Sequence, residues 1–222
     1  MFDSRTVAVT ARGERAESTP DLRELKELAG KVAPVVLAGE QVIAVDSAVR
    51  GLLPGEAMRR GSVVSVDGPP GSGATSLLFR LVAAASKDGS WVAMVGMPDV
   101  GMLAAAEAGV VLDRVAVIPE PGGHWPLVTA ALLDAIDLVV VRPPTRVRPQ
   151  DARKLATRTR ERGGILLVAG AWPEGADVRL TAQRSRWTGL EAGHGFLRGR
   201  TVDVQTDGRG AAGRRRRLDV AV

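Results

Sequence analysis

The stretch SVVSVDGPPGSGATSLLFRLVAAAS, residues 62–86, decides the fold. It opens with SVVSVD, a β-branched run typical of a buried strand, and ends with TSLLFRLVAAAS, an apolar run typical of a helix. The loop between them, GPPGSGAT at 68–75, follows the phosphate-binding template G-x-x-x-x-G-K-[ST], except that Ala74 replaces the lysine. Glycines in this template let backbone N–H groups converge on phosphate oxygens at a helix N-terminus. We infer that the loop descends from a nucleotide-binding protein.

The missing lysine affects catalysis more than binding. Losing one charge-assisted contact weakens binding by about 1.5 to 3 kcal/mol, but the lysine also stabilises the phosphoryl group during transfer. No basic residue in the loop replaces it, and Arg80 lies more than one turn down the helix. We therefore expect no cofactor, and at most weak binding of ATP or ADP. The residues of this degenerate nucleotide site are Gly68, Gly71, Ser72, Gly73, Ala74, Thr75 and Ser76.

A second charge is wrong for phosphoryl transfer. The strand that should end in a magnesium-binding aspartate reads DLVVVR at 137–142 and ends in Arg142, which would repel Mg²⁺. Asp99 follows another strand and could imitate a catalytic carboxylate, although the simpler interpretation makes it the N-cap of the next helix. We expect no catalytic residue, no metal site and no enzymatic hydrolysis.

Alternating strands and helices flank the loop and predict an α/β fold with a mainly parallel sheet covered on both faces. The pattern predicts strands at 62–67, 91–96, 114–120, 137–143 and 164–170, and helices at 75–86, 99–109, 126–135 and 149–163. Beyond residue 177 the helices stop. Alternating segments at 177–183, 196–205 and 214–222 predict antiparallel strands that extend the sheet at one edge.

The chain divides into two parts. Residues 1–44 are expected to form a flexible arm and a short amphipathic helix, and residues 45–222 the core with its C-terminal β extension. The helix either packs on its own domain or docks on a partner. Its apolar positions recur at helical spacing and are Leu22, Leu25 and Leu28.

Composition excludes several classes of function. The chain has no cysteine and two histidines, which rules out disulfides and thiol chemistry and leaves little for a zinc site. It has neither an uninterrupted apolar run of about 18 residues nor the pattern of a secretory signal, so we expect a cytoplasmic protein with no membrane partner.

Basic residues concentrate in the last third. Residues 142–222 hold 18 basic and 8 acidic side chains, whereas residues 1–141 hold 12 and 17. This asymmetry favours DNA or an acidic partner, with a solvated arginine-rich surface as the alternative. The candidate contact residues are Arg142, Arg146, Arg148, Arg184, Arg186, Arg214, Arg215, Arg216 and Arg217.

The order of these motifs resembles the RecA family. In residues 49–86 a leucine-proline-glycine turn, the basic-glycine pair Arg60-Gly61, a strand, the phosphate loop and an alanine-rich helix follow one another as in RecA. The resemblance covers about residues 45–205. It implies a RecA-like core, from which the chain departs at Ala74, at Arg142 and in lacking the catalytic glutamate.

A short RecA-like chain without ATPase groups is most similar to the ImuA family, including its actinobacterial ImuA-prime type. That resemblance implies a non-catalytic accessory role in SOS-induced, error-prone translesion DNA synthesis and DNA repair, with association with the nucleoid after damage. It implies as partners ImuB, an inactive Y-family polymerase homologue, and an error-prone C-family polymerase assembly. DNA binding and self-association stay open. The alternative is a DNA-dependent ATPase or recombination mediator with an atypical loop.

Overall fold

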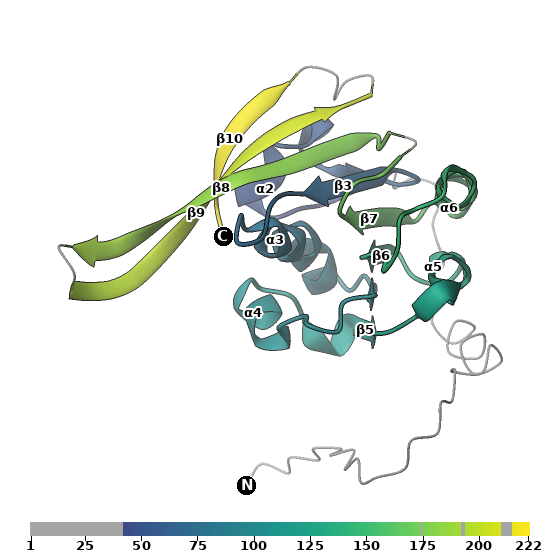
Figure 1. Cartoon of the computed structure of the whole chain (residues 1–222), viewed down its shortest axis with the longest axis horizontal. Coiled ribbons are helices and arrows are strands. Elements are labelled where there is room, and N and C mark those ends of the chain that lie inside the picture. Colours follow the sequence, from purple (N-terminus) through teal and green to yellow (C-terminus); the bar gives the residue numbers. More distant parts are fainter. Residues whose placement is uncertain (1–41, 174, 192–193, 210–214) are drawn as a thin grey trace, which may run out of the picture.

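A sheet of eight strands runs through the protein in the order β10-β9-β8-β3-β7-β6-β4-β5. The structure, a computed structural model, describes residues 42–173, 175–191, 194–209 and 215–222. Figure 1 shows helices on both sides of the sheet and a long pair of strands that leaves it. The predicted arm and docking helix, with Leu22, Leu25 and Leu28, lie outside the described residues.

The parallel half of the sheet confirms the strands predicted from the β-branched runs. Each is shorter than predicted, by one or two residues at one or both ends, because the flanking positions enter turns. These strands are β3 (Val63–Asp67), β4 (Val92–Val95), β5 (Val115–Ile118), β6 (Leu138–Val141) and β7 (Ile165–Ala169). All pairings among them are parallel, so their carboxyl ends meet at one edge.

In the part of the chain that the structure describes, five helices accompany the sheet. They are α2 (Ser47–Arg50), α3 (Ala74–Lys87), α4 (Met102–Glu107), α5 (Trp125–Leu133) and α6 (Pro149–Arg162). Three short 3₁₀ turns occur at Pro54–Glu56 (η1), Leu112–Arg114 (η2) and Gly122–His124 (η3). The predicted helix at 99–109 is too long, because α4 starts only after Gly101. A two-stranded sheet of β1 (Val42–Ile43) and β2 (Met58–Arg59) was not predicted.

Two apolar cores lie on opposite faces of the sheet. The strand β6 shows why, because its alternate residues enter different cores: Leu138 and Val140 pack with α3, whereas Val139 and Val141 pack with α5 and α6. All four are fully buried. Continuous apolar strands are what a sheet covered on both faces requires.

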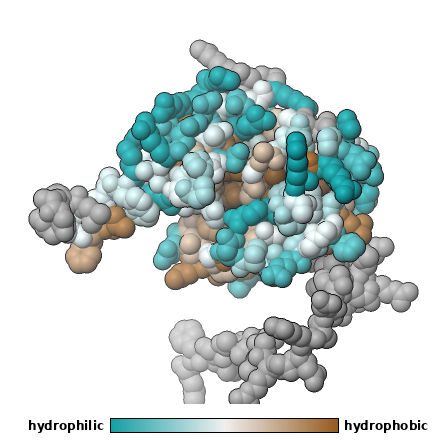
Figure 2. Space-filling model, in the orientation of Figure 1, coloured by the Kyte–Doolittle hydropathy of each residue, from teal (hydrophilic) through white to brown (hydrophobic). Residues whose placement is uncertain are grey.

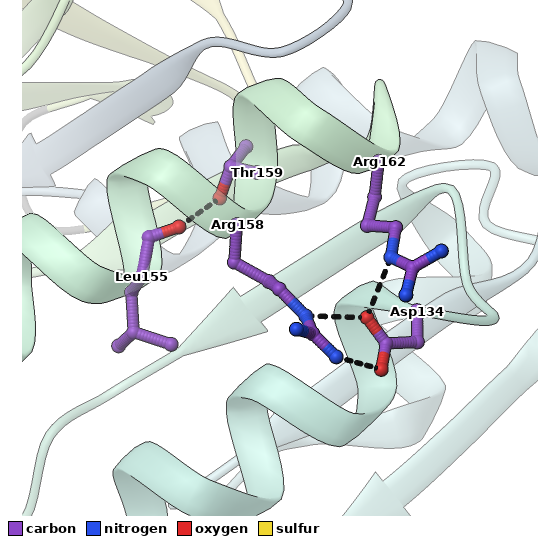
Figure 3. A network of polar contacts seen from close by, with 5 residues as sticks. All are labelled: Asp134, Leu155, Arg158, Thr159 and Arg162. Carbon is purple, nitrogen blue, oxygen red and sulfur yellow. Dashed lines mark hydrogen bonds and ion pairs between the residues drawn. The ribbon is translucent and has the colours of Figure 1, made fainter.

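The basic helix α6 is tied to α5 by one carboxylate. Asp134 accepts hydrogen bonds from Arg158 Nε at 2.6 Å and from Arg162 Nε at 3.0 Å, and it also binds Arg158 Nη2 (Figure 3). On the buried side of the same helix, the Thr159 hydroxyl donates to the Leu155 carbonyl at 2.7 Å. The hydrogen bond to Asp134 raises the pKa of Arg158. Two arginines of this basic helix therefore have a structural role.

Three C-terminal strands extend the sheet beside β3; β8 pairs with β3 in parallel, and the pairings of β8 with β9 and of β9 with β10 are antiparallel, as predicted. They are β8 (Val178–Glu191), β9 (His194–Gly208) and β10 (Arg216–Ala221), and β8 joins the parallel half through β3. The first two are much longer than predicted. The fold is thus a mixed α/β one with a mainly parallel eight-stranded sheet. Among the described residues, no helix is both long and apolar enough to cross a membrane.

A buried carboxylate ties the added strands together. Asp203 on β9 is 3% exposed and accepts from Arg217 Nε on β10 at 2.7 Å, and it also binds Arg217 Nη2. From the other neighbour, Arg184 Nε on β8 lies 3.8 Å from the same carboxylate. The hydrogen bonds from Arg217 hold the pKa of Asp203 below its usual value, against the opposing effect of burial.

Candidate functional site

The loop between β3 and α3 lies at the carboxyl ends of the parallel strands, where ligands of such sheets bind. Gly71 and Gly73 have φ values of +78° and +99°, a left-handed conformation that favours glycine. Gly73 is the N-cap of α3 and makes no side-chain cap hydrogen bond. The N–H groups of the first helical turn have no partner within the helix, and they point toward the loop. The left-handed conformations of Gly71 and Gly73 thus shape the turn that leads into α3.

A cavity of about 460 Å³ opens beside this loop. It is lined by every predicted residue of the degenerate site: Gly68, Gly71, Ser72, Gly73, Ala74, Thr75 and Ser76. Asp99 after β4, Arg142 after β6 and Arg200 on β9 also line it. A cavity of about 560 Å³ near the start of β3 is basic, but it lies at the opposite ends of the strands.

Arg142 and Asp99 meet in the cavity as an ion pair. The Arg142 Nη1 atom donates to Asp99 Oδ1 at 2.5 Å, joining the end of β6 to the segment after β4. The prediction that Asp99 is a helix N-cap is wrong, because Gly101 holds that position. The ion pair also directs Asp99, the carboxylate that could imitate a catalytic base, onto a cation.

Arg200 is the site residue that the sequence did not reveal. From β9 its Nη2 atom donates to the Gly71 carbonyl at 2.6 Å, and its Nη1 atom lies 3.5 Å from Ser76 Oγ. Its guanidinium stacks 4.9 Å from the centroid of the Trp187 ring. No basic residue stands within the loop itself, but Arg200 approaches it from β9, 129 positions after Gly71. Strand alternation places Arg200 on the same face as buried Val202, but it does not reveal that this face covers the loop.

The strands β8 and β9 pack directly on the loop. The Ser185 hydroxyl of β8 donates to the Gly71 carbonyl at 3.1 Å. A Cβ atom on Gly73 would lie 2.4 Å from Val202 Cγ2, and one on Gly68 would lie 2.4 Å from the Ala182 carbonyl. The C-terminal strands therefore form one wall of the cavity, and the loop glycines allow their close approach.

The comparisons with known proteins concern the central part of the chain. Residues 51–174, more than half of the 222, match the family described as the MT3502 N-terminal domain. The chain belongs to this family. It is also 46% identical over 125 residues to the uncharacterized protein Rv3395c of Mycobacterium tuberculosis (strain ATCC 25618 / H37Rv). That alignment covers 52% of this chain and 59% of the relative, less than two thirds of its length.

The part that matches the MT3502 N-terminal domain family holds most of the cavity. The loop, Asp99 and Arg142 fall within residues 51–174, whereas Arg200 and the strands β8 to β10 lie beyond them. The family therefore accounts for the sheet and the loop, while the C-terminal wall of the cavity lies outside the matched residues.

Two other charged residues of this family member lie away from the loop. Arg80, which could have replaced the lysine, is directed to Asp46, with 3.9 Å between Nη1 and Oδ2. Asp137 at the start of β6 accepts from Arg60 at 2.9 Å, at the strand end opposite the cavity. Arg80 is therefore not a substitute cation in this structure.

The predicted basic contact residues do not form one patch. Arg184 and Arg217 bind Asp203, and Arg186 donates to Asp219 at 2.6 Å. Arg146 and Arg148 are exposed before α6, and Arg215 and Arg216 are exposed beside Arg217. Arg214 lies outside the described residues. The arginine run is therefore only partly a solvated edge, because Arg217 holds two strands together.

Proposed function

We propose that this chain is a non-catalytic, RecA-like accessory protein of the ImuA type. It acts in SOS-induced, error-prone translesion DNA synthesis by binding an ImuB-like inactive Y-family polymerase homologue. Through that homologue it joins the error-prone C-family polymerase assembly in the cytoplasm, at the nucleoid after damage.

Support for a RecA-like core comes from the place of the loop. The loop follows β3, which lies inside the sheet between β7 and β8, and it leads into the long apolar helix α3. Its glycines and its hydroxyl residues line a cavity at the carboxyl ends of parallel strands. Antiparallel strands added on one side agree with the order of segments in the sequence.

The observation that carries the non-catalytic proposal is the ion pair between Arg142 and Asp99. Phosphoryl transfer needs a metal-binding carboxylate and a cation on the transferred group. In this cavity Arg142 lies at the end of β6, and it is paired with the nearby carboxylate of Asp99. Ala74 replaces the lysine of the loop. A fold without these groups can still bind other molecules through its surface.

We expect the purified chain to release no phosphate from ATP above background, with or without single-stranded DNA. The physical reason is that the loop has no lysine to stabilise the transferred phosphoryl group. The cavity also has no carboxylate at the end of β6 to hold Mg²⁺ beside the outer phosphates. A phosphate-release assay checks this, with Thr75→Ala as the control that reports contaminating ATPase. Turnover by the wild type that Thr75→Ala abolishes would overturn the proposal.

A second candidate is a DNA-dependent ATPase or recombination mediator, and Arg200 is the observation that favours it. Its guanidinium lies at the loop and could bind phosphate if it left the Gly71 carbonyl. The same assay separates the candidates. ATPase activity that is lost in Arg200→Ala and in Thr75→Ala identifies the enzyme, whereas background release in all three chains identifies the accessory protein.

A further inference from the structure

Beyond the sheet, β8 and β9 continue as a two-stranded ribbon, of which the structure describes residues 182–191 and 194–200. The strand β3 pairs with β8 only over Val178–Thr181, and β10 pairs with β9 only over Thr201–Thr206. Within the described part of the chain, the ribbon therefore has no third strand on either side. Figure 1 shows it extending away from the body of the protein at the left.

The ribbon has a defined shape. The pairing register shifts between Ala182 and Arg184 and again between Thr188 and Leu190, as β-bulges do. Beside the second shift, Gly189 has a φ of +103°, and a Cβ atom there would lie 2.1 Å from the Phe196 carbonyl. The two strands are thus in close contact near the tip, which fixes the direction of the side chains around it.

Large apolar side chains are exposed along this ribbon. Phe196 is 86% exposed, and Leu197 and Trp187 are each 53% exposed. Figure 2 shows a hydrophobic patch at the projecting end, separated from the body by hydrophilic and neutral residues. A two-stranded ribbon is only marginally stable alone, and an exposed apolar patch with free strand edges favours an interaction site.

The charges of the ribbon favour a protein partner over nucleic acid. Residues 182–200 contain four arginines and one glutamate, so the ribbon complements an acidic surface. Three of the arginines are held within the molecule: Arg184 by Asp203, Arg186 by Asp219, and Arg200 by the Gly71 carbonyl. Arg198 is exposed beside the apolar tip. DNA binding needs several cations directed at phosphates, whereas an aliphatic and aromatic tip fits an apolar groove.

We propose that the ribbon is a docking arm that inserts Phe196 and Leu197 into an apolar groove of its partner protein, with Arg198 meeting carboxylates on the rim of that groove. The inference rests on the proposed function, since it assigns the surface through which the accessory protein holds its polymerase homologue. Burial of two large apolar side chains at the centre of an interface is what gives such a contact its affinity. Phe196 and Leu197 lie outside both apolar cores, so they can be changed without a cavity in either.

The test compares two pairs of exposed, large apolar side chains in the full chain. Phe196→Ser/Leu197→Ser changes the ribbon, and Leu103→Ser/Leu127→Ser changes two side chains of similar exposure, 74% and 54%, on α4 and α5. Affinity of each for the recombinant polymerase homologue is measured by titration calorimetry, and thermal unfolding checks that each variant folds. We expect at least tenfold weaker binding for the ribbon variant and unchanged binding for the control.

Charge reversal gives a second, independent readout. Arg198→Glu is expected to weaken binding and to reduce its dependence on salt, whereas Lys154→Glu, at an exposed position on α6, is expected to change neither. Equal affinity of wild type and ribbon variant would overturn the docking arm and leave the proposed function standing. A wild type that does not bind the homologue overturns both. Loss of single-stranded DNA affinity in the ribbon variant, with the protein complex intact, would overturn the choice of partner.

Discussion

Replacing Gly73 by alanine lowers the free energy of unfolding by about 3 kcal/mol, because two costs add at this position. The residue has a φ of +99°, a conformation that alanine rarely adopts. The new Cβ atom would also lie 2.4 Å from Val202 Cγ2, so β9 must shift away from the loop. Thermal and urea unfolding of the two chains measure the difference.

Gly71→Ala is the matched control for this prediction. Gly71 belongs to the same loop and has a φ of +78°, but no atom lies within 4 Å of its added Cβ. Only the conformational cost remains, about 1 kcal/mol. Equal destabilisation by the two substitutions would contradict the close packing of the C-terminal strands on the loop.

Replacing Asp203 by asparagine destabilises the three C-terminal strands by about 1 to 2 kcal/mol at neutral pH. The change removes the charge that both Arg217 and Arg184 approach at a buried position. Asp219→Asn is the control, because Asp219 pairs directly across from Asp203 on β10 but is 55% exposed. We expect a much smaller effect there, since solvent screens exposed ion pairs. Thermal unfolding of the three chains measures both effects.

The same substitution has a defined pH dependence. Arg217 lowers the pKa of Asp203 in the folded protein, so the carboxylate contributes stability above its unfolded pKa of about 3.9. That contribution disappears as the pH falls through the lower, folded value. The difference in melting temperature between wild type and Asp203→Asn should therefore be constant from pH 7 to about pH 5 and shrink below about pH 4. A difference that grows in acid would contradict this assignment.

The parallel half of the fold could be predicted because its signals are local. The β-branched run before the loop, the glycines within it and the apolar run after it each specify their own structure. The signal that ends α4 is local as well. Gly109 follows this helix and has a φ of +94°, a conformation that glycine favours at a helix end. The two-residue strands β1 and β2 are too short to show a period.

The parts that were missed depend on residues distant in sequence. Asp99 has the side chain of an N-cap, but its ion pair with Arg142, 43 positions away, determines its place. Arg200 reaches the loop only because β9 follows β8 beside β3. Glycines near the ribbon tip, such as Gly189 and Gly195, indicate turns by composition, yet they lie inside the long strands β8 and β9. Tertiary pairing overrode the local signal at each of these positions.

These contacts give the protein one consistent chemical character. The cavity at the loop has internal partners for its charges, with Arg142 on Asp99 and Arg200 on the Gly71 carbonyl. The ribbon, in contrast, directs Phe196 outward. This arrangement supports the proposed accessory function.

The most direct test of that account is the affinity of the full chain for the ImuB-like polymerase homologue, measured with ATP, with ADP and without nucleotide. A non-catalytic accessory protein needs no phosphate contact to present its surface, so we expect one stable complex with the same Kd in all three conditions, and the same value for Thr75→Ala. A complex that forms only with ATP, or no complex in any condition, would contradict it.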